Sequence, residues 1–135
     1  MINQQLKLLI EYRLSESEET LRKAKILLNQ SAFRGTINRS YYAMFYAALG
    51  LLATKGLGSS KHSGIVSFFD REFVKTGIFS KDLSRSFHRA FDERQASDYG
   101  EMLEADMGSA MALFERAQNF VDEITQYLKS WMEVN

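Results

Sequence analysis

The feature that most constrains the fold is an apolar repeat near the C-terminal end of the chain. Its members are separated by alternating steps of four and three residues over four heptads: Leu103, Met107, Ala110, Phe114, Ala117, Val121, Ile124, Leu128 and Trp131. This spacing places them along one side of a continuous α-helix, which at 1.5 Å per residue is about 40 Å long. The sequence therefore predicts an all-α protein with a long C-terminal helix.

The rest of the chain agrees with this prediction. Proline is absent from all 135 residues, and dense loop signals occur only at 55–64, 75–82 and 98–102. Apolar spacing predicts the other helices at about 5–30, at 33–55, at 63–75 and from about 80 onward, where Ser80 is a plausible N-cap. We expect a single domain, residues 1–135, folded as an up-and-down helical bundle of about five helices.

A second apolar line lies beside the C-terminal repeat, at Phe120 and Tyr127. A small bundle does not need this much apolar surface on one helix. The surplus therefore indicates that two copies of the chain associate as a homodimer.

Composition excludes several kinds of site. The chain has no cysteine, two histidines 26 positions apart, no P-loop and no dinucleotide-binding glycine motif, so we expect neither a metal site nor a cofactor. Lysine plus arginine equals aspartate plus glutamate, at 17 each, so binding to nucleic acid or to a membrane would need a local patch. Because no apolar run resembles a membrane span or a signal peptide, we expect a cytoplasmic protein without membrane contact.

The first candidate site is the stretch NRSYYAMFYAA at 38–48. Arg39, Tyr42 and Tyr46 share one face of the predicted second helix, where a guanidinium beside phenols would clamp a phosphate or stack on a base. In the structural alternative, the arginine pairs with a carboxylate of a neighbouring helix while the tyrosines fill the core. Aromatic residues at helical spacing favour the structural interpretation.

The second candidate is the stretch SSKHSG at 59–64. Lys61 and His62 stand where the third helix is expected to begin, and free backbone N–H groups there would form an anion site with the lysine and the serine hydroxyls. His62 is also a possible general acid or base. The other interpretation, which ranks first because a single histidine is weak evidence, is a solvated loop with a serine cap and a histidine packed along the face of Ile65 and Phe69.

The third candidate is the stretch ERQASDYG at 93–100. Arg94 continues the apolar stripe of the predicted fourth helix, and a half-buried guanidinium needs a partner. Asp98 has the spacing of an i,i+4 ion pair with it. Either this pair is structural, or Arg94, Asp98 and Tyr99 border a groove that binds a ligand.

Three stretches in this order, NRSYYAMFYAALGLL, KHSGIVSFFDREFVKTG and ERQASDYGEM, resemble the HEPN family, in particular its small stand-alone prokaryotic branch. The resemblance covers about residues 8–130. It implies a bundle of four or five helices that dimerises and that is often encoded beside a minimal nucleotidyltransferase. It also implies a link to toxins of toxin–antitoxin pairs, some of which cleave RNA without a metal.

In the RNA-cleaving members of that family, an arginine is followed four to six residues later by a histidine, and the site is completed across the dimer. Arg94 matches the arginine, but Tyr99 stands where the histidine is expected. The resemblance thus implies a dimeric module that binds a nucleotide or RNA, or partners a nucleotidyltransferase, without the ribonuclease histidine. Two alternatives stay open: a metal-independent endoribonuclease in which Arg94 binds phosphate and His62 or Tyr99 moves the proton, and a structural subunit without a ligand.

Overall fold

The computed structural model describes residues 2–98 and 105–135, and the regular secondary structure of this part is entirely helical. Its elements are α1 (Gln4–Asn29), α2 (Phe33–Ala53), α3 (His62–Phe69), the π-helical segment η1 (Asp70–Val74), α4 (Lys81–Asp98) and α5 (Met107–Val134). The predicted all-α bundle with a long C-terminal helix is confirmed. None of these helices is both long enough and apolar enough to cross a membrane.

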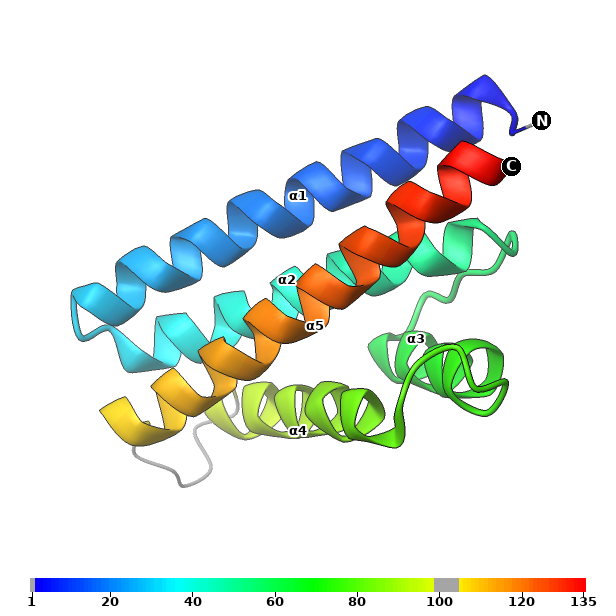
Figure 1. Ribbon diagram of the computed structural model, residues 1–135. Coiled ribbons are helices and arrows are strands. Elements are labelled where there is room, and N and C mark those ends of the chain that lie inside the picture. The colour runs from blue at the N-terminus through cyan, green and yellow to red at the C-terminus, as the bar shows by residue number, and fades with distance from the viewer. Residues whose placement is uncertain (1, 99–104) are drawn as a thin grey trace.

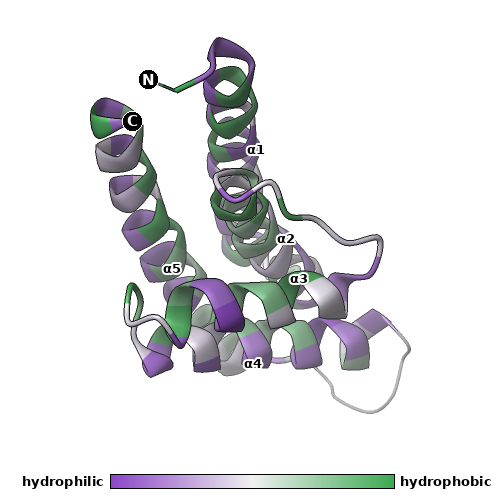
Figure 2. Cartoon of the chain, turned by 90° about the vertical axis from the view of Figure 1, so that its right-hand side faces the viewer, coloured by the Kyte–Doolittle hydropathy of each residue, from purple (hydrophilic) through white to green (hydrophobic). Residues whose placement is uncertain are grey.

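The helices α1, α2, α4 and α5 alternate in direction along the bundle (Figure 1). The central one is α2, which packs against α1, α3, α4 and α5 and has twelve buried residues. In Figure 2, α3 and α4 cross below the other three helices, and the apolar faces of the elements turn toward one another. This arrangement brings the start of α3 and the second half of α4 against the same part of α2.

Local signals set the helix ends. The hydroxyl of Ser80 accepts a hydrogen bond from the backbone N–H of Leu83 at 3.2 Å, which confirms the predicted N-cap of α4. The turn before it contains Gly77 at a φ of +83°, a backbone conformation that glycine adopts without strain. At the start of α5, the carboxylate of Asp106 accepts from the backbone N–H of Ser109 at 2.8 Å.

The apolar repeat of α5 faces the interior over most of its length. The buried members are Ala110, Phe114, Ala117, Val121, Ile124 and Leu128. At the two ends, Met107 is 57% exposed and Trp131 is partly buried at the edge of the core. Leu103 lies outside the described residues, and among the described members the first buried one is Ala110.

The second apolar line of α5 is covered within one chain. Phe120 is fully buried, with its ring centre 5.3 Å from that of Phe69 and 5.0 Å from that of Phe87. The ring of Tyr127 lies edge-on to Phe73 at 6.3 Å. The segment α3–η1 folds back over this line, which the pattern of α5 alone does not reveal. The argument for a homodimer from surplus apolar surface here is therefore wrong, and dimerisation stays a prediction from the family resemblance.

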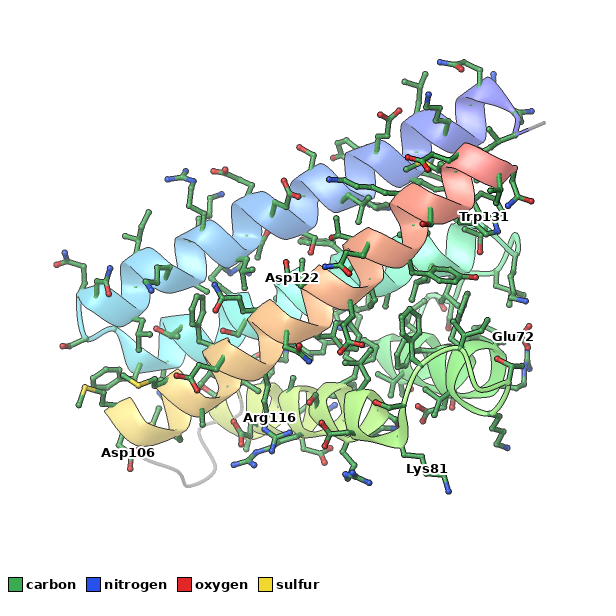
Figure 3. The ribbon with its side chains drawn as sticks, in the orientation of Figure 1. Glu72, Lys81, Asp106, Arg116, Asp122 and Trp131 are labelled. Atoms are coloured by element: carbon green, nitrogen blue, oxygen red, sulfur yellow. The ribbon has the colours of Figure 1, made fainter. Side chains whose placement is uncertain are left out.

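Two polar contacts tie the helices together inside the bundle. The buried Ser17 of α1 donates its hydroxyl to the carbonyl oxygen of Ala43 in α2 at 2.6 Å. Between α5 and α4, Nη1 of Arg116 donates to the hydroxyl of Ser86 at 3.1 Å, and Figure 3 shows Arg116 directed toward α4. Both buried hydroxyls are thus satisfied, as stable packing requires.

Candidate functional site

Two tyrosines of α2, the first residue of α3 and an arginine of α4 meet in one cluster, which we call the Arg94 site (Tyr41, Tyr42, His62 and Arg94). The guanidinium carbon of Arg94 lies 5.4 Å from the ring centres of both tyrosines. Its Nη2 donates a hydrogen bond to the hydroxyl of Tyr42 at 3.0 Å. The ring centre of His62 is 5.8 Å from that of Tyr41 and 5.7 Å from that of Tyr42.

The guanidinium of Arg94 is held at the edge of the core, with its side chain 20% exposed. Its Nε lies 2.8 Å from Oδ2 of Asp98, which confirms the predicted i,i+4 ion pair. The N–H of that nitrogen is not directed at the carboxylate, so Nε is buried without a hydrogen-bond partner in the described part of the chain. Attraction between the charges therefore holds the pair, and the guanidinium keeps unused donors.

Arg39 brings a second cation to the same tyrosine. Its guanidinium carbon lies 5.0 Å from the ring centre of Tyr42. Its Nε and Nη2 donate to Oδ1 of the neighbouring Asn38 at 3.0 and 2.7 Å. Within residues 2–98 and 105–135 it has no ion pair with a carboxylate, so the structural alternative, a carboxylate of a neighbouring helix, finds no partner among these residues. Two guanidinium groups thus share one phenol ring.

His62 is the first residue of α3 and packs against α2. Its ring stacks on Phe45 with 4.2 Å between centres, and its Nδ1 lies 2.9 Å from the hydroxyl of Tyr41. The prediction of a serine cap is wrong, because Lys61 occupies the N-cap position and its side chain makes no capping hydrogen bond. Burial first, and then the positive charge of Arg94, lower the pKa of His62 below its usual value.

Tyr41 is the residue that the sequence pattern missed, because its spacing assigns it only to the core. It is indeed fully buried, and burial raises the pKa of its phenol well above the usual range although the charge of Arg94 opposes the shift. The hydroxyl was the available signal, since a buried phenol needs a hydrogen-bond partner. That partner, His62, lies 21 positions away in the sequence.

The remaining predicted residues lie at or beyond the edge of the Arg94 site. The ring of Tyr46 is partly exposed and its centre is 6.0 Å from that of Tyr42. Lys61 is exposed, and no ion pair or ring contact within the described ranges joins its side chain to the site. Tyr99 lies outside the described residues, so its role stays a prediction.

The chemistry of the cluster suits a phosphate rather than a metal. Across residues 2–98 and 105–135, no three acidic or imidazole side chains gather closely enough to hold a metal ion. The second histidine, His88, makes its contact elsewhere, with Nε2 2.5 Å from Oδ2 of Asp70. Guanidinium groups and phenol hydroxyls bind phosphate oxygens, and partly exposed tyrosine faces can stack on a base.

The chain is similar to the HEPN domain and to several named proteins. The model of the HEPN domain matches residues 10–130. A UPF0332 protein of Thermotoga maritima is 40% identical over 121 residues, which make up 90% of this chain and 92% of that protein. Two proteins of Methanocaldococcus jannaschii, each named "Putative toxin", are 31% identical; one alignment covers 90% of this chain and 82% of the relative, and the other covers 96% of both.

Proposed function

The chain belongs to the HEPN domain family, and on this premise we propose that it is a dimeric binding module whose Arg94 site holds a phosphate of a nucleotide or of RNA. The observation that carries the proposal is the approach of Arg39 and Arg94 to the ring of Tyr42. Like charges repel, so two guanidinium groups on one ring favour an anion between or beside them. Asp98 offsets one of the two charges, and within residues 2–98 and 105–135 no carboxylate offsets the other.

Each side chain contributes what its chemistry allows. Arg94 has N–H groups beyond the one that it donates to Tyr42, and that tyrosine accepts through its oxygen and keeps its own proton for a phosphate oxygen. The partly exposed rings of Tyr42 and Tyr46 offer stacking surfaces for a base. Lys61, exposed beside His62 in the sequence, adds a positive charge for a longer strand.

Partners of the module follow from the family. The proposal includes a second copy of the chain and a minimal nucleotidyltransferase in a toxin–antitoxin-type pair, all in the cytoplasm. The two Methanocaldococcus jannaschii relatives named "Putative toxin" support the toxin link. Sedimentation at micromolar concentration is expected to report a dimer, and purification from the native host with mass spectrometry is expected to recover the nucleotidyltransferase. A monomer at that concentration contradicts the dimeric part of the proposal.

The test of the phosphate site is binding of a fluorescein-labelled oligouridylate, with AMP as a competitor, measured by fluorescence anisotropy. Arg94→Ala is expected to weaken binding about tenfold or more, because a hydrogen bond to a charged group contributes about 1.5–3 kcal/mol. Arg89→Ala is the matched control: it also removes an i,i+4 ion pair of α4, with Glu93 at 2.9 Å, but Arg89 is 49% exposed. Equal losses in both variants, or none in Arg94→Ala, contradict the proposal, and no binding by wild type favours a structural subunit.

A second candidate function is a metal-independent endoribonuclease, and the position of His62 favours it. His62 contacts the same two tyrosines as Arg94, so Arg94 would hold the scissile phosphate while His62 or Tyr99 moved a proton. Cleavage of bulk RNA in EDTA, lost in Arg94→Ala with the fold intact, would support the enzyme. Full activity in both His62→Ala and Tyr99→Phe would contradict these proton roles.

A further inference from the structure

The hydrogen bond between Tyr41 and His62 fixes more than the position of the imidazole. The phenol of Tyr41 is fully buried, and in the described part of the chain its hydroxyl is hydrogen-bonded to Nδ1 of His62, at 2.9 Å. A buried O–H that donates to nothing is costly, so this proton points at Nδ1. A neutral imidazole whose Nδ1 accepts carries its own proton on Nε2. Nε2 is then an N–H donor, and the hydrogen bond from Tyr41 sets the tautomer of the imidazole ring.

The surroundings of His62 disfavour a second proton on the ring. From α2, the rings of Tyr41, Tyr42 and Phe45 take water away from the imidazole. The guanidinium of Arg94, from α4, lies over the same tyrosine rings, and burial together with its charge lowers the pKa of the imidazole.

The element to which His62 belongs acts in the same direction. His62 is the first residue of α3, where the positive end of the helix dipole repels an imidazolium. Lys61, the residue before it, adds another positive charge. The ring is therefore neutral at pH 7, in the form that donates through Nε2.

We infer that His62, oriented by Tyr41, is a neutral hydrogen-bond donor that binds a phosphate oxygen through Nε2–H beside Arg94. This inference rests on the proposed phosphate site and gives His62 a definite part in it. In this form Nε2 has no lone pair to take a proton, and a neutral imidazole is a very weak acid. His62 thus binds the ligand and does not transfer protons, which argues against the endoribonuclease role for this residue.

The first arm of the test needs no ligand. Long-range 15N–1H spectra of the two histidine side chains, with His88→Gln for assignment, report which nitrogen carries the proton at pH 7. The expected result is His62 with the proton on Nε2 and an accepting Nδ1 in the wild type, and a mixture of tautomers in Tyr41→Phe. A protonated ring, or the proton on Nδ1 in the wild type, overturns the inference, and the wild-type spectrum decides this even where Tyr41→Phe fails to fold.

The second arm measures binding of the labelled oligouridylate and of AMP at pH 7. His62→Ala is expected to weaken binding of the probe about tenfold, whereas His62→Gln, whose amide N–H replaces the Nε2–H donor, is expected to stay within about threefold of wild type. AMP binding by the wild type that weakens in His62→Ala assigns the contact to a nucleotide phosphate, whereas a wild type that binds oligouridylate and not AMP assigns it to an RNA phosphodiester.

The proposed phosphate site and the inference about His62 are contradicted by different results. Binding that is lost in Arg94→Ala but unchanged in His62→Ala, or a His62→Gln variant as weak as His62→Ala, overturns the inference and leaves the proposed function intact. A wild-type protein that binds neither probe overturns both.

Discussion

Two aromatic clusters lie next to each other in this bundle and differ in polarity. One consists of the rings of Phe69, Phe73, Phe87 and Phe120, with neighbouring centres 5.0 to 6.4 Å apart. The other is the Arg94 site, and Tyr41 joins the two because its ring centre is 6.3 Å from that of Phe87. The phenylalanine side chains have no polar atom, whereas the Arg94 site brings two phenols, an imidazole and a guanidinium together.

This difference in polarity indicates which of the two clusters is the better candidate for a binding site. Phenylalanines satisfy the needs of packing alone, so their presence is fully explained by stability. A half-buried ionic cluster is no more stabilising than apolar side chains of similar volume. The polar groups of the Arg94 site therefore need a further reason, and binding of an anion supplies one.

The largest expected effect on stability lies in the phenylalanine cluster. Phe87→Ala leaves a cavity among rings that are fully buried and is expected to lower the free energy of unfolding by about 3–5 kcal/mol, measured by urea denaturation. Phe87→Leu, which keeps most of the volume, is the milder control. A loss below about 1 kcal/mol in Phe87→Ala would show that the phenylalanine cluster contributes little to the stability of the fold.

Arg94→Met separates binding from stability at the other cluster. Methionine fills a similar volume without the charge, so the free energy of unfolding is expected to change by about 1 kcal/mol or less, in either direction. Binding of the labelled oligouridylate is expected to fall about tenfold or more. If instead urea denaturation reports a loss near that of Phe87→Ala while binding persists, the guanidinium serves the fold and the comparison fails.

Tyr42→Phe removes a single oxygen from the Arg94 site. The hydroxyl accepts from Nη2 of Arg94, so its loss is expected to cost about 1 kcal/mol of stability and about fivefold in affinity for oligouridylate. Tyr12→Phe provides a matched control, because Tyr12 lies 58% exposed on α1. Identical behaviour of the two variants in both assays would mean that the hydroxyl of Tyr42 has no role.

The smallest expected effect is a pH dependence of stability from His62. Because burial and Arg94 lower the pKa of His62 in the folded chain, the unfolded chain takes up the proton first as the pH falls. The free energy of unfolding should therefore decrease as the pH falls below about 6.5, and this contribution levels off once the folded ring is protonated as well. Urea denaturation between about pH 7.5 and 5.5 should show a steeper decline in wild type than in His62→Gln, which cannot titrate. Parallel curves would be inconsistent with a lowered pKa, since His88 is common to both proteins.

The sequence predicts the features that depend on residues a few positions apart in the chain. The N-cap at Ser80 and the ion pair between Arg94 and Asp98 span three and four residues, so helix spacing alone was sufficient. The family resemblance likewise predicts Arg94 as a site residue, because Arg94 matches the arginine of the family's motif. The helices followed from the apolar periodicity in the same way.

Contacts between distant segments were not predictable from that spacing. Tyr41 meets His62 only because the segment after α2 returns α3 to the tyrosine face, and no pattern within α2 specifies that return. The segment α3–η1 covers Phe120, so the apolar surface that appeared to be in surplus on α5 is buried within the chain. Arg39 donates to its neighbour Asn38, and an amide one position away is not a partner that helix spacing predicts.

Phosphate binding at Arg94 is tested most directly by an NMR titration of the arginine side-chain Nε–H signals with AMP and with oligouridylate. Arg94 is expected to shift with saturation, together with the ring signals of His62, while Arg89 on the same helix stays in place. Such shifts would locate the phosphate at the Arg94 site. A saturating titration in which the Nε–H signal of Arg94 does not shift would contradict phosphate binding at the Arg94 site, even if signals of other residues shift.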